Sequence, residues 1–268
     1  MLPLYILKLG GSVITAKREG KPVIKKEEII RIAKEIMNAQ KKDPFGLILI
    51  HGAGSFGHGL AKKYKLWEGL TRNSQILAFS KTQAQTVFLN HTVLDVFASL
   101  GLPVVAINPT SIIIQKDKKL VTFSKEAIVH FLERGFIPVL YGTVVADTKL
   151  SGSICSGDTM LTHLAKELKA RRAIFATDVD GVFTQDPNRF EHASLIAEIT
   201  DENYKEVIKG SQGSASKIDV GGGMRGKLEE IHQSLKKVEV LIVNGSKKGS
   251  IQKALVGEKL KGTKILFS

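Results

Sequence analysis

Residues 51–58 read His-Gly-Ala-Gly-Ser-Phe-Gly-His, and they directly follow an unbroken apolar run at residues 47–50. Such a run is typical of a strand that is buried on both faces. The residues after the turn are rich in lysine and compatible with a helix. A Gly-rich turn between a strand and a helix leaves backbone N–H groups accessible, and this arrangement receives phosphate groups. We therefore expect a phosphate-binding turn at residues 51–58.

The same turn also fits the dinucleotide-binding fingerprint, through Gly52, Gly54 and Gly57. That interpretation needs an acidic residue at the end of the next strand, about 20 residues further on. Glu68 is the nearest candidate, and no strand pattern precedes it. A turn that is rich in glycine only for its geometry would not require two histidines and a serine. The pattern therefore favours a phosphate site over both alternatives.

The composition is ordinary for a globular protein, with 268 residues of which 43% are hydrophobic and 24% are charged. No apolar run approaches the ~20 residues that a bilayer-spanning helix needs, so we expect no membrane partner. The first residues lack the charged segment and the cleavage site of a signal peptide. The single cysteine, Cys155, excludes an internal disulfide framework and suits a reducing compartment. These features together indicate a cytoplasmic location.

The formal net charge of +13 indicates anionic ligands rather than nucleic acid. Nucleic-acid binding favours a basic patch with aromatic side chains, or a known reading module. Here the lysines are spread over many segments, aromatic residues make up only 6% of the chain, and no such module is present. Most of the charge is expected on a solvated surface, and the remainder would steer anionic substrates toward the protein.

Hydrophobic patterns along the chain alternate between buried strands and amphipathic helices. The expected strands are residues 4–9, 47–50, 103–107, 112–114, 137–141, 173–176, 238–243 and 264–267. The expected helices are residues 27–41, 75–100, 125–134, 159–168 and 228–235, and the expected polar connectors are residues 15–21 and 151–158. This alternation predicts an α/β fold with a mostly parallel central sheet. No linker marks a boundary, so we expect a single domain over residues 1–268 with a soft division near residues 150–170.

Three further segments place charged side chains beside turns. Lys8 lies near the end of the first strand, before Gly10-Gly11-Ser12, where a buried ammonium is costly unless it meets an anion or reaches solvent. Asp178 and Asp180 follow the strand at residues 173–176, at the sheet edge where α/β proteins bind ligands, although turn chemistry alone would also explain them. Residues 217–227 are a third Gly-rich segment, which precedes a helix.

The catalytic signatures of several other enzyme classes are missing from the sequence. It has no Walker motif, no protein-kinase motif set and no nucleophile elbow of the hydrolases. The seven histidines are scattered and the chain contains a single cysteine, so no metal site is predicted. The remaining candidate is a site of backbone amides, lysines and a histidine, which suits the stabilisation of a transferring phosphoryl group.

Five motifs, in this order, resemble those of the amino acid kinase superfamily and cover almost the whole chain: residues 8–12, 51–58, 156–158, 177–183, and 222–224 with Lys227. Within the superfamily, the turn that ends in His58 resembles the turn of the isopentenyl phosphate kinases. The resemblance implies a three-layer αβα sandwich, with the acceptor in an N-terminal lobe (about residues 1–160) and ATP in a C-terminal lobe (about residues 161–268). It also implies phosphorylation of isopentenyl phosphate to isopentenyl diphosphate by ATP and Mg²⁺, in a mevalonate-type isoprenoid route.

The resemblance further implies roles for single residues. Those that would bind ATP are Lys8, Leu9, Gly10, Gly11, Ser12, Gly54, Asp178, Gly223 and Lys227. Those that would contact the substrate phosphate are Ala53, His58 and Gly157. Lys17, which by itself reads as a surface residue, would stabilise charge in the transition state, and Asp158 would orient the lysines. The implied catalytic set is thus Lys8, Lys17, His58 and Asp158.

The sequence motifs alone do not exclude other functions. Fosfomycin kinases share much of the turn at residues 51–58, so a fosfomycin-type or other small-acid kinase fits the same pattern. A regulatory nucleotide-binding module would need the phosphate-binding turns but not the catalytic charges, and the presence of both lysines and His58 argues against it. An isopentenyl tail needs an apolar cavity, and the candidate side chains, which are otherwise ordinary core residues, are Ile76, Phe79, Val87 and Phe88.

Three further expectations concern partners. The superfamily suggests a homodimer. Mg²⁺ would be held mainly by ATP oxygens and water, because no carboxylate cluster clearly offers a site. Lys217 lies in a Gly/Ser-rich stretch similar to that of Lys227, and we prefer Lys227 as the nucleotide contact.

Overall fold

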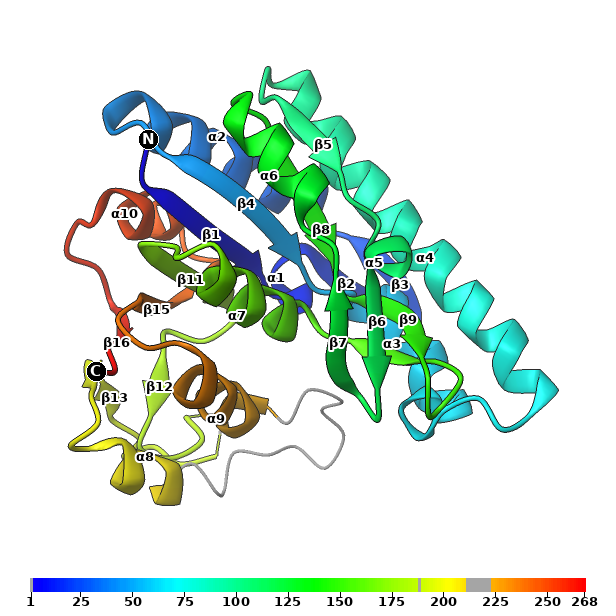
Figure 1. The fold of residues 1–268 in the computed structure, drawn as a ribbon. Helices are drawn as coiled ribbons and strands as arrows, with labels where there is room; N and C mark the ends of the chain where they lie inside the picture. Colours follow the sequence, from blue (N-terminus) through cyan, green and yellow to red (C-terminus); the bar gives the residue numbers. More distant parts are fainter. Residues whose placement is uncertain (1, 188, 211–222) are drawn as a thin grey trace. The chain divides into compact units, whose positions relative to one another are not determined.

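The computed structural model describes residues 2–187, 189–210 and 223–268, which form two compact units (Figure 1). The first unit contains the chain up to Leu9, residues 35–45, and the chain from Asp158 onward. The second unit contains residues 10–34 and 46–157. The chain therefore leaves the first unit after Leu9, returns to it for residues 35–45, and returns again at Asp158.

The first unit is built on a sheet with the strand order β14-β16-β15-β11-β1. Its strands β1 (Leu4–Leu9), β11 (Arg172–Thr177) and β15 (Glu239–Asn244) are parallel and buried along most of their length. β16 (Gly262–Ile265) runs antiparallel to β15 and parallel to β14 (Glu198–Ile199). Because β1, β11 and β15 are parallel and in register, Leu9, Thr177 and Asn244 end at the same edge of this sheet.

Several helices belong to the first unit. They are the second half of α2 (Lys26–Lys42), α7 (Gly157–Glu167) from Asp158, α8 (Tyr204–Gly210), α9 (Gly223–Ser234) and α10 (Ser250–Val256), and a short hairpin joins β12 (Val182–Phe183) to β13 (Leu195–Ile196).

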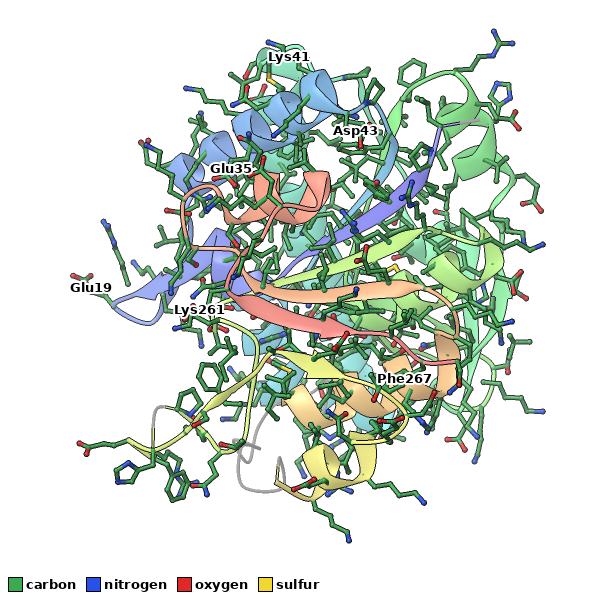
Figure 2. The ribbon with its side chains drawn as sticks, turned by 90° about the vertical axis from the view of Figure 1, so that its left-hand side faces the viewer. Glu19, Glu35, Lys41, Asp43, Lys261 and Phe267 are labelled. Carbon is green, nitrogen blue, oxygen red and sulfur yellow. The ribbon has the colours of Figure 1, made fainter. Side chains whose placement is uncertain are left out.

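Charged side chains hold both ends of α10. Backbone N–H groups of Gly249 and Ile251 donate to the buried Glu35 carboxylate at 2.8 and 3.0 Å (Figure 2). At the other end, Arg172 donates to the Ala254 carbonyl at 2.8 Å. An acid at the start of a helix and a base at its end complement the helix dipole, so this helix is fixed on β11 and β15.

The second unit contains the parallel strands β4 (Gly46–His51), β8 (Ile137–Tyr141) and β5 (Val104–Ala106), in that order. The long helix α4 (Asn73–Ser99) packs on β5 and β8, and α6 (Glu126–Glu133) packs on β8 and β4. A second sheet has the order β10-β9-β6-β7, from β10 (Ser153–Cys155), β9 (Thr143–Asp147), β6 (Ile113–Lys116) and β7 (Lys119–Phe123).

The remaining elements of the second unit surround the Gly-rich turns. They are α1 (Gly11–Ile14), the hairpin of β2 (Thr15–Arg18) and β3 (Lys21–Ile24), α3 (Gly54–Tyr64), a 3₁₀ turn η1 (Leu66–Glu68) and α5 (Pro109–Ile112).

The predicted α/β class with a mostly parallel sheet is confirmed, and the predicted long strands and helices are found within a few residues of their expected bounds. Two predicted connectors are wrong. Residues 15–21 belong to the β2–β3 hairpin, which turns at Glu19 and Gly20 with positive φ. The polar side chains gave no strand pattern, because the pairing of this hairpin is made by the backbone. Residues 151–158 include β10, whose three residues are too few to show a period.

Short elements account for the other differences. The strand expected at residues 112–114 begins at Ile113, after the single turn of α5. The elements that were not predicted are α1, η1, β7, β9, β12, β13, β14, α8 and α10. Residues 217–222 of the third Gly-rich segment lie outside the described residues. No helix among the described residues is both long and apolar enough to cross a bilayer.

Candidate active site

A cluster of two lysines and one aspartate lies at the carboxyl edge of the first unit's sheet. Lys8 Nζ on β1 lies 2.8 Å from Asp158 Oδ1, and Lys227 Nζ on α9 lies 2.5 Å from Asp158 Oδ2. The three side chains are only 8–17% exposed. The structure thus brings together three of the predicted site residues that are far apart in the sequence, and the predicted orienting role of Asp158 has a geometric basis.

Burial and charge oppose each other in this cluster. Burial alone would raise the pKa of Asp158, but the two ammonium groups outweigh it and hold that pKa well below its usual range. Burial lowers the pKa of Lys227, and the Asp158 carboxylate offsets part of this effect. Lys227 also lies 4.7 Å from the centre of the Phe175 ring, a favourable cation–π distance. The single carboxylate of Asp158 therefore balances the charge of only one of the two buried ammonium groups. One positive charge of the cluster remains for an anion.

A second carboxylate supports the position of α9. Glu230, one turn after Lys227, accepts a hydrogen bond from the Thr162 hydroxyl of α7 at 3.1 Å. Burial raises the pKa of Glu230, and the nearby Asp158 charge adds to this effect. Sequence reasoning did not single out Glu230, because a glutamate on an amphipathic helix gives no signal that it is buried.

Asp178 and Asp180, the predicted acidic pair after β11, differ in their surroundings. Asp178 is exposed, as a ligand contact would require. Asp180 is paired with Lys247 at 2.6 Å and Lys261 at 2.9 Å, and Asn244 of β15 donates to it at 3.0 Å. Asp180 therefore has a structural role at this sheet edge. Turn chemistry, the alternative explanation from the sequence, agrees with a structural role but did not predict the contacts with the two lysines.

In the second unit the two Gly-rich turns pack directly against each other, backbone to backbone. A Cβ atom on Gly11 would lie 2.4 Å from both N and Cα of Gly54, and one on Gly52 would lie 2.7 Å from the Gly11 nitrogen. Gly54 has φ of +51°, a conformation that favours glycine. Close contact of these turns, rather than flexibility, is the reason that glycine is needed at all three positions.

Thr15 and Ser55 hold the two turns in place. The sequence marked Ser55 as part of the turn but did not predict this role, and it did not mark Thr15. The Thr15 hydroxyl donates to the Gly11 carbonyl at 2.8 Å and accepts from the Ser55 backbone N–H at 3.1 Å. The Ser55 hydroxyl donates to the Ala16 carbonyl at 2.8 Å. These bonds connect the start of α3 to β2.

Lys17 and His58 lie on elements that this connection joins. Lys17 is on β2 and His58 is in α3, which packs against β2, and both side chains are exposed. Both side chains are therefore accessible to a ligand.

Gly142 is a further site residue that the sequence analysis did not identify. It follows β8, and its N–H donates to the His51 carbonyl at 2.8 Å. A Cβ atom at Gly142 would lie 3.3 Å from the Gly157 nitrogen and 3.5 Å from the Ala53 nitrogen. The amides of Ala53 and Gly157, both predicted to contact the substrate phosphate, are thus neighbours on the two sides of Gly142. A glycine placed directly after a buried strand was the available signal.

Of the four apolar side chains considered for the substrate tail, only Phe79 packs in a core cluster, with Ala61, Leu66, Ala78 and Val144. Ile76, Val87 and Phe88 are 58%, 42% and 56% exposed, so they are not core residues. Phe88 lies with its ring centre 6.1 Å from that of Phe56, which is two residues before His58.

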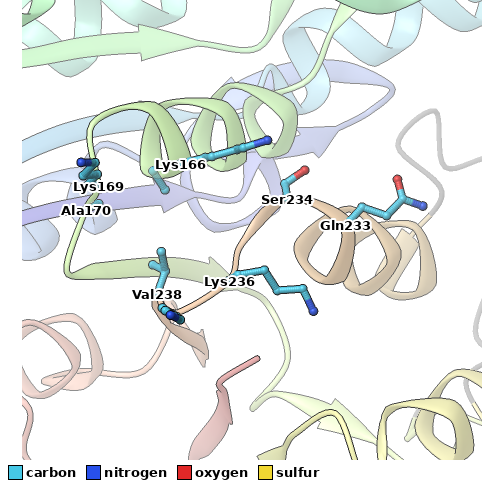
Figure 3. A pocket seen from close by; sticks show the side chains of 9 residues that line it. Lys166, Lys169, Ala170, Gln233, Ser234, Lys236 and Val238 are labelled. Carbon is cyan, nitrogen blue, oxygen red and sulfur yellow. The ribbon is translucent and has the colours of Figure 1, made fainter. Parts of the chain in front are cut away.

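A cavity of about 430 Å³ lies at the other ends of α7 and α9, away from Asp158 and Lys227 (Figure 3). Its lining residues are Ala165, Lys166, Lys169, Ala170, Gln233, Ser234, Lys236, Lys237 and Val238. Lysines at the ends of helices complement the partial negative charge of the helix C-terminus, whereas the same carbonyl groups repel a phosphate. We therefore do not assign the substrates to this cavity.

Metal binding by the protein itself is not supported by the part of the chain that the structure describes. Within residues 2–187, 189–210 and 223–268, no group of three His, Cys, Asp or Glu side chains is arranged to hold a metal ion. The buried carboxylate nearest to the proposed phosphate site, Asp158, is occupied by two lysines.

Comparisons with known proteins identify the family of this chain. Residues 3–244 match the amino acid kinase family. The chain is 37% identical over 98% of both chains to isopentenyl phosphate kinase of Methanothermobacter thermautotrophicus, and 38% identical over 99% of both chains to that of Methanocaldococcus jannaschii. A crystal structure of an isopentenyl phosphate kinase, 35% identical, superposes with a TM-score of 0.84 over 98% of this chain and 99% of that one. The chain therefore belongs to the amino acid kinase family.

Proposed function

We propose that this protein transfers the terminal phosphoryl group of ATP to isopentenyl phosphate and so forms isopentenyl diphosphate. The observation that carries the proposal is the buried Lys8–Asp158–Lys227 cluster, whose surplus positive charge suits a polyphosphate. Relatives that are 37–38% identical over nearly their whole length carry the name isopentenyl phosphate kinase, which favours this acceptor over fosfomycin or a carboxylate.

On this proposal the charged cluster of the first unit binds ATP. Lys8 and Lys227 would contact the phosphates, and Asp158 would hold both ammonium groups in place. Asp178 and Gly223 lie on the first unit and would contact the rest of the nucleotide. Leu9, Gly10, Gly11, Ser12 and Gly54 would offer backbone N–H groups to the transferring phosphates. Lys217, the alternative to Lys227, lies outside the described residues.

The acceptor phosphate would bind in the second unit. The Ala53 and Gly157 amides, brought together at Gly142, would donate to its oxygens, and His58 would add a side-chain donor. The apolar tail of the acceptor would pack on the exposed face of Phe88, beside Phe56. This contact would favour binding, since each buried CH₂ contributes about 0.8 kcal/mol to the binding free energy.

The chemistry needs no general base. A phosphate monoester has a second pKa of about 6, so the attacking oxygen is already largely ionised at neutral pH. The main barrier is repulsion between two polyanions, which is strong in a site of low dielectric constant. Lys8, Lys17 and the backbone amides would offset this repulsion and favour direct in-line transfer. Mg²⁺, which reduces the charge of ATP when bound, would be held by phosphate oxygens and water, since the described residues do not form a site for it.

Further parts of the account stay predictions. These are the division into an acceptor lobe (residues 1–160) and an ATP lobe (residues 161–268), assembly as a homodimer, a cytoplasmic location and a place in a mevalonate-type isoprenoid route.

The proposal is tested by ADP release with Mg-ATP and a panel of isopentenyl phosphate, dimethylallyl phosphate, fosfomycin and small carboxylates. We expect the highest turnover with isopentenyl phosphate. Lys8→Met should abolish this turnover, whereas Lys42→Met, which removes an exposed partner of Glu258, should retain it. Turnover confined to fosfomycin or a carboxylate would contradict the acceptor, and tight ATP binding without any turnover would point to a regulatory module.

A further inference from the structure

His51, the first residue of the Gly-rich turn, is a buried histidine for which the mechanism above has no use. It ends β4, it is 0% exposed, and its ring stacks on Tyr141 with 5.6 Å between ring centres. Nδ1 lies 3.1 Å from the Gly52 carbonyl oxygen, and Nε2 lies 3.1 Å from the side-chain oxygen Oδ1 of Asn90 on α4. The four preceding residues are apolar, so an apolar side chain would satisfy burial at this position equally well.

The two hydrogen bonds determine where the ring carries its proton. Burial lowers the pKa of His51 to about 4, so the ring is neutral near pH 7 and has one N–H donor and one acceptor nitrogen. The Gly52 carbonyl can only accept, whereas the Asn90 amide can turn to present either its oxygen or its NH₂ group. Only one arrangement satisfies both contacts of a neutral ring: Nδ1–H donates to Gly52, and the Asn90 amide is turned so that its NH₂ group, in the place of Oδ1, donates to Nε2.

The bond to Gly52 also fixes the next peptide group. A trans peptide is planar, so the Gly52 carbonyl and the Ala53 N–H point in opposite directions. Because the carbonyl is directed at the buried His51 ring, the Ala53 N–H is directed away from it. The Ala53 nitrogen lies beside Gly142, together with the Gly157 nitrogen.

We propose that His51 is a positioning residue, whose Nδ1–H bond to the Gly52 carbonyl turns the Ala53 amide toward the acceptor phosphate. The inference rests on the proposed function only for the identity of that phosphate. His51 does not touch the substrate. It acts through the orientation of one peptide group, the one that joins Gly52 to Ala53.

Two substitutions separate the positioning bond from the packing of the ring. The side-chain nitrogen of asparagine is one carbon from Cβ, as Nδ1 is in histidine, whereas that of glutamine is two carbons away, as Nε2 is. His51→Asn therefore keeps the donor to Gly52, and His51→Gln keeps only the contact with Asn90. Both variants lose the stacked ring, so they are matched controls for packing.

We expect His51→Gln to raise the KM for the acceptor by about 10-fold, the effect of one lost donor, with the KM for ATP changed less than about 3-fold. His51→Asn should keep the acceptor KM within about 3-fold of the wild-type value. Equal acceptor KM values in the two variants, or parallel changes in the KM for ATP, would overturn the positioning role.

A second measurement covers the case in which the variants do not fold and needs no substrate. In ¹⁵N-histidine-labelled wild-type protein, NMR shifts should identify the His51 ring as the Nδ1–H tautomer at about pH 7. An Nε2–H tautomer or a charged ring would overturn the inference, even if the protein phosphorylates isopentenyl phosphate. Conversely, the Nδ1–H tautomer in a protein without kinase activity would leave the hydrogen bond intact and remove only the proposed function.

Discussion

The charged cluster of the first unit and the Gly-rich turns of the second unit suit phosphate by opposite means. The cluster uses side chains: Lys8 and Lys227 share one buried carboxylate, Asp158. The turns use almost no side chains, because Gly11 and Gly54 are so close that a Cβ on Gly11 would lie 2.4 Å from the backbone of Gly54. The first site supplies charge, and the second supplies backbone donors at fixed positions.

This difference predicts how each site responds to mutation. A charge cluster is sensitive to the loss of a single group, because the remaining charges stay buried without compensation. A backbone site is insensitive to most side-chain losses but sensitive to added volume and to the residues that orient its peptide groups. The following predictions start from the largest expected effect.

Asp158→Asn should have the largest effect. The substitution preserves size but leaves Lys8 and Lys227 as buried cations without a counter-charge, so we expect turnover to fall by about 10³-fold and the free energy of unfolding to fall by about 3 kcal/mol. Steady-state kinetics and urea denaturation measure the two effects.

Asp180→Asn is the matched control for stability in the same unit. Asp180 also holds two lysines, but Lys247 and Lys261 are 55% and 63% exposed and remain solvated when the carboxylate is lost. We expect a loss of about 1 kcal/mol or less. If both variants lost the same free energy of unfolding, burial of Lys8 and Lys227 would not explain how Asp158 stabilises the protein.

The second prediction concerns pH and the second unit. The pKa of His51 is about 4 in the folded protein, below its ordinary value of 6.5, so the unfolded chain binds the proton more readily between these values. Stability from this group is therefore fully present above about pH 6.5 and is lost as the pH falls toward 4. Between pH 7 and pH 5 the loss should be about 2 kcal/mol.

His51→Asn removes this titration. The decrease in the free energy of unfolding between pH 7 and pH 5 should therefore be about 2 kcal/mol smaller in the variant than in the wild-type protein. Urea denaturation at the two pH values provides the comparison. The same pH dependence in both proteins would show that the ring is not buried in its neutral form.

The two sites were also predictable from the sequence to different degrees. Lys8, Asp158 and Lys227 were identified as site residues by their motifs, but that Asp158 holds both lysines depends on strands and helices that meet only in the fold. The contribution of Glu230 was hidden, because burial of one glutamate on an amphipathic helix leaves no pattern in the sequence.

The Gly-rich turns were predicted from one stretch, since glycine and a preceding buried strand are local signals. Their supports were not predicted. Ser55 of the helix α3 is hydrogen-bonded to Thr15 and to Ala16 of the hairpin, and the sequence predicted a loop in place of this hairpin. Gly142 becomes part of the site only because β8 pairs with β4, which brings residues separated by about 90 positions to the same sheet edge.

The smallest expected effects are changes in the KM values for ATP and for the acceptor in the variants Gly142→Ala and Lys227→Met. These KM values test most directly whether the two sites bind different substrates. The added methyl group lies on the Ala53 and Gly157 amides, 3.3 Å from the Gly157 nitrogen, and Gly142 is not among the glycines with positive φ, so alanine can adopt its backbone conformation. Methionine keeps the apolar stem of Lys227 and removes its charge.

We predict a crossed result. Gly142→Ala should raise the acceptor KM about 10-fold and leave the ATP KM within about 2-fold, and Lys227→Met should do the reverse. If Gly142→Ala changed only the KM for ATP, or if both variants changed both values equally, the assignment of the acceptor phosphate to the Ala53 and Gly157 amides and of ATP to the charged cluster would be wrong.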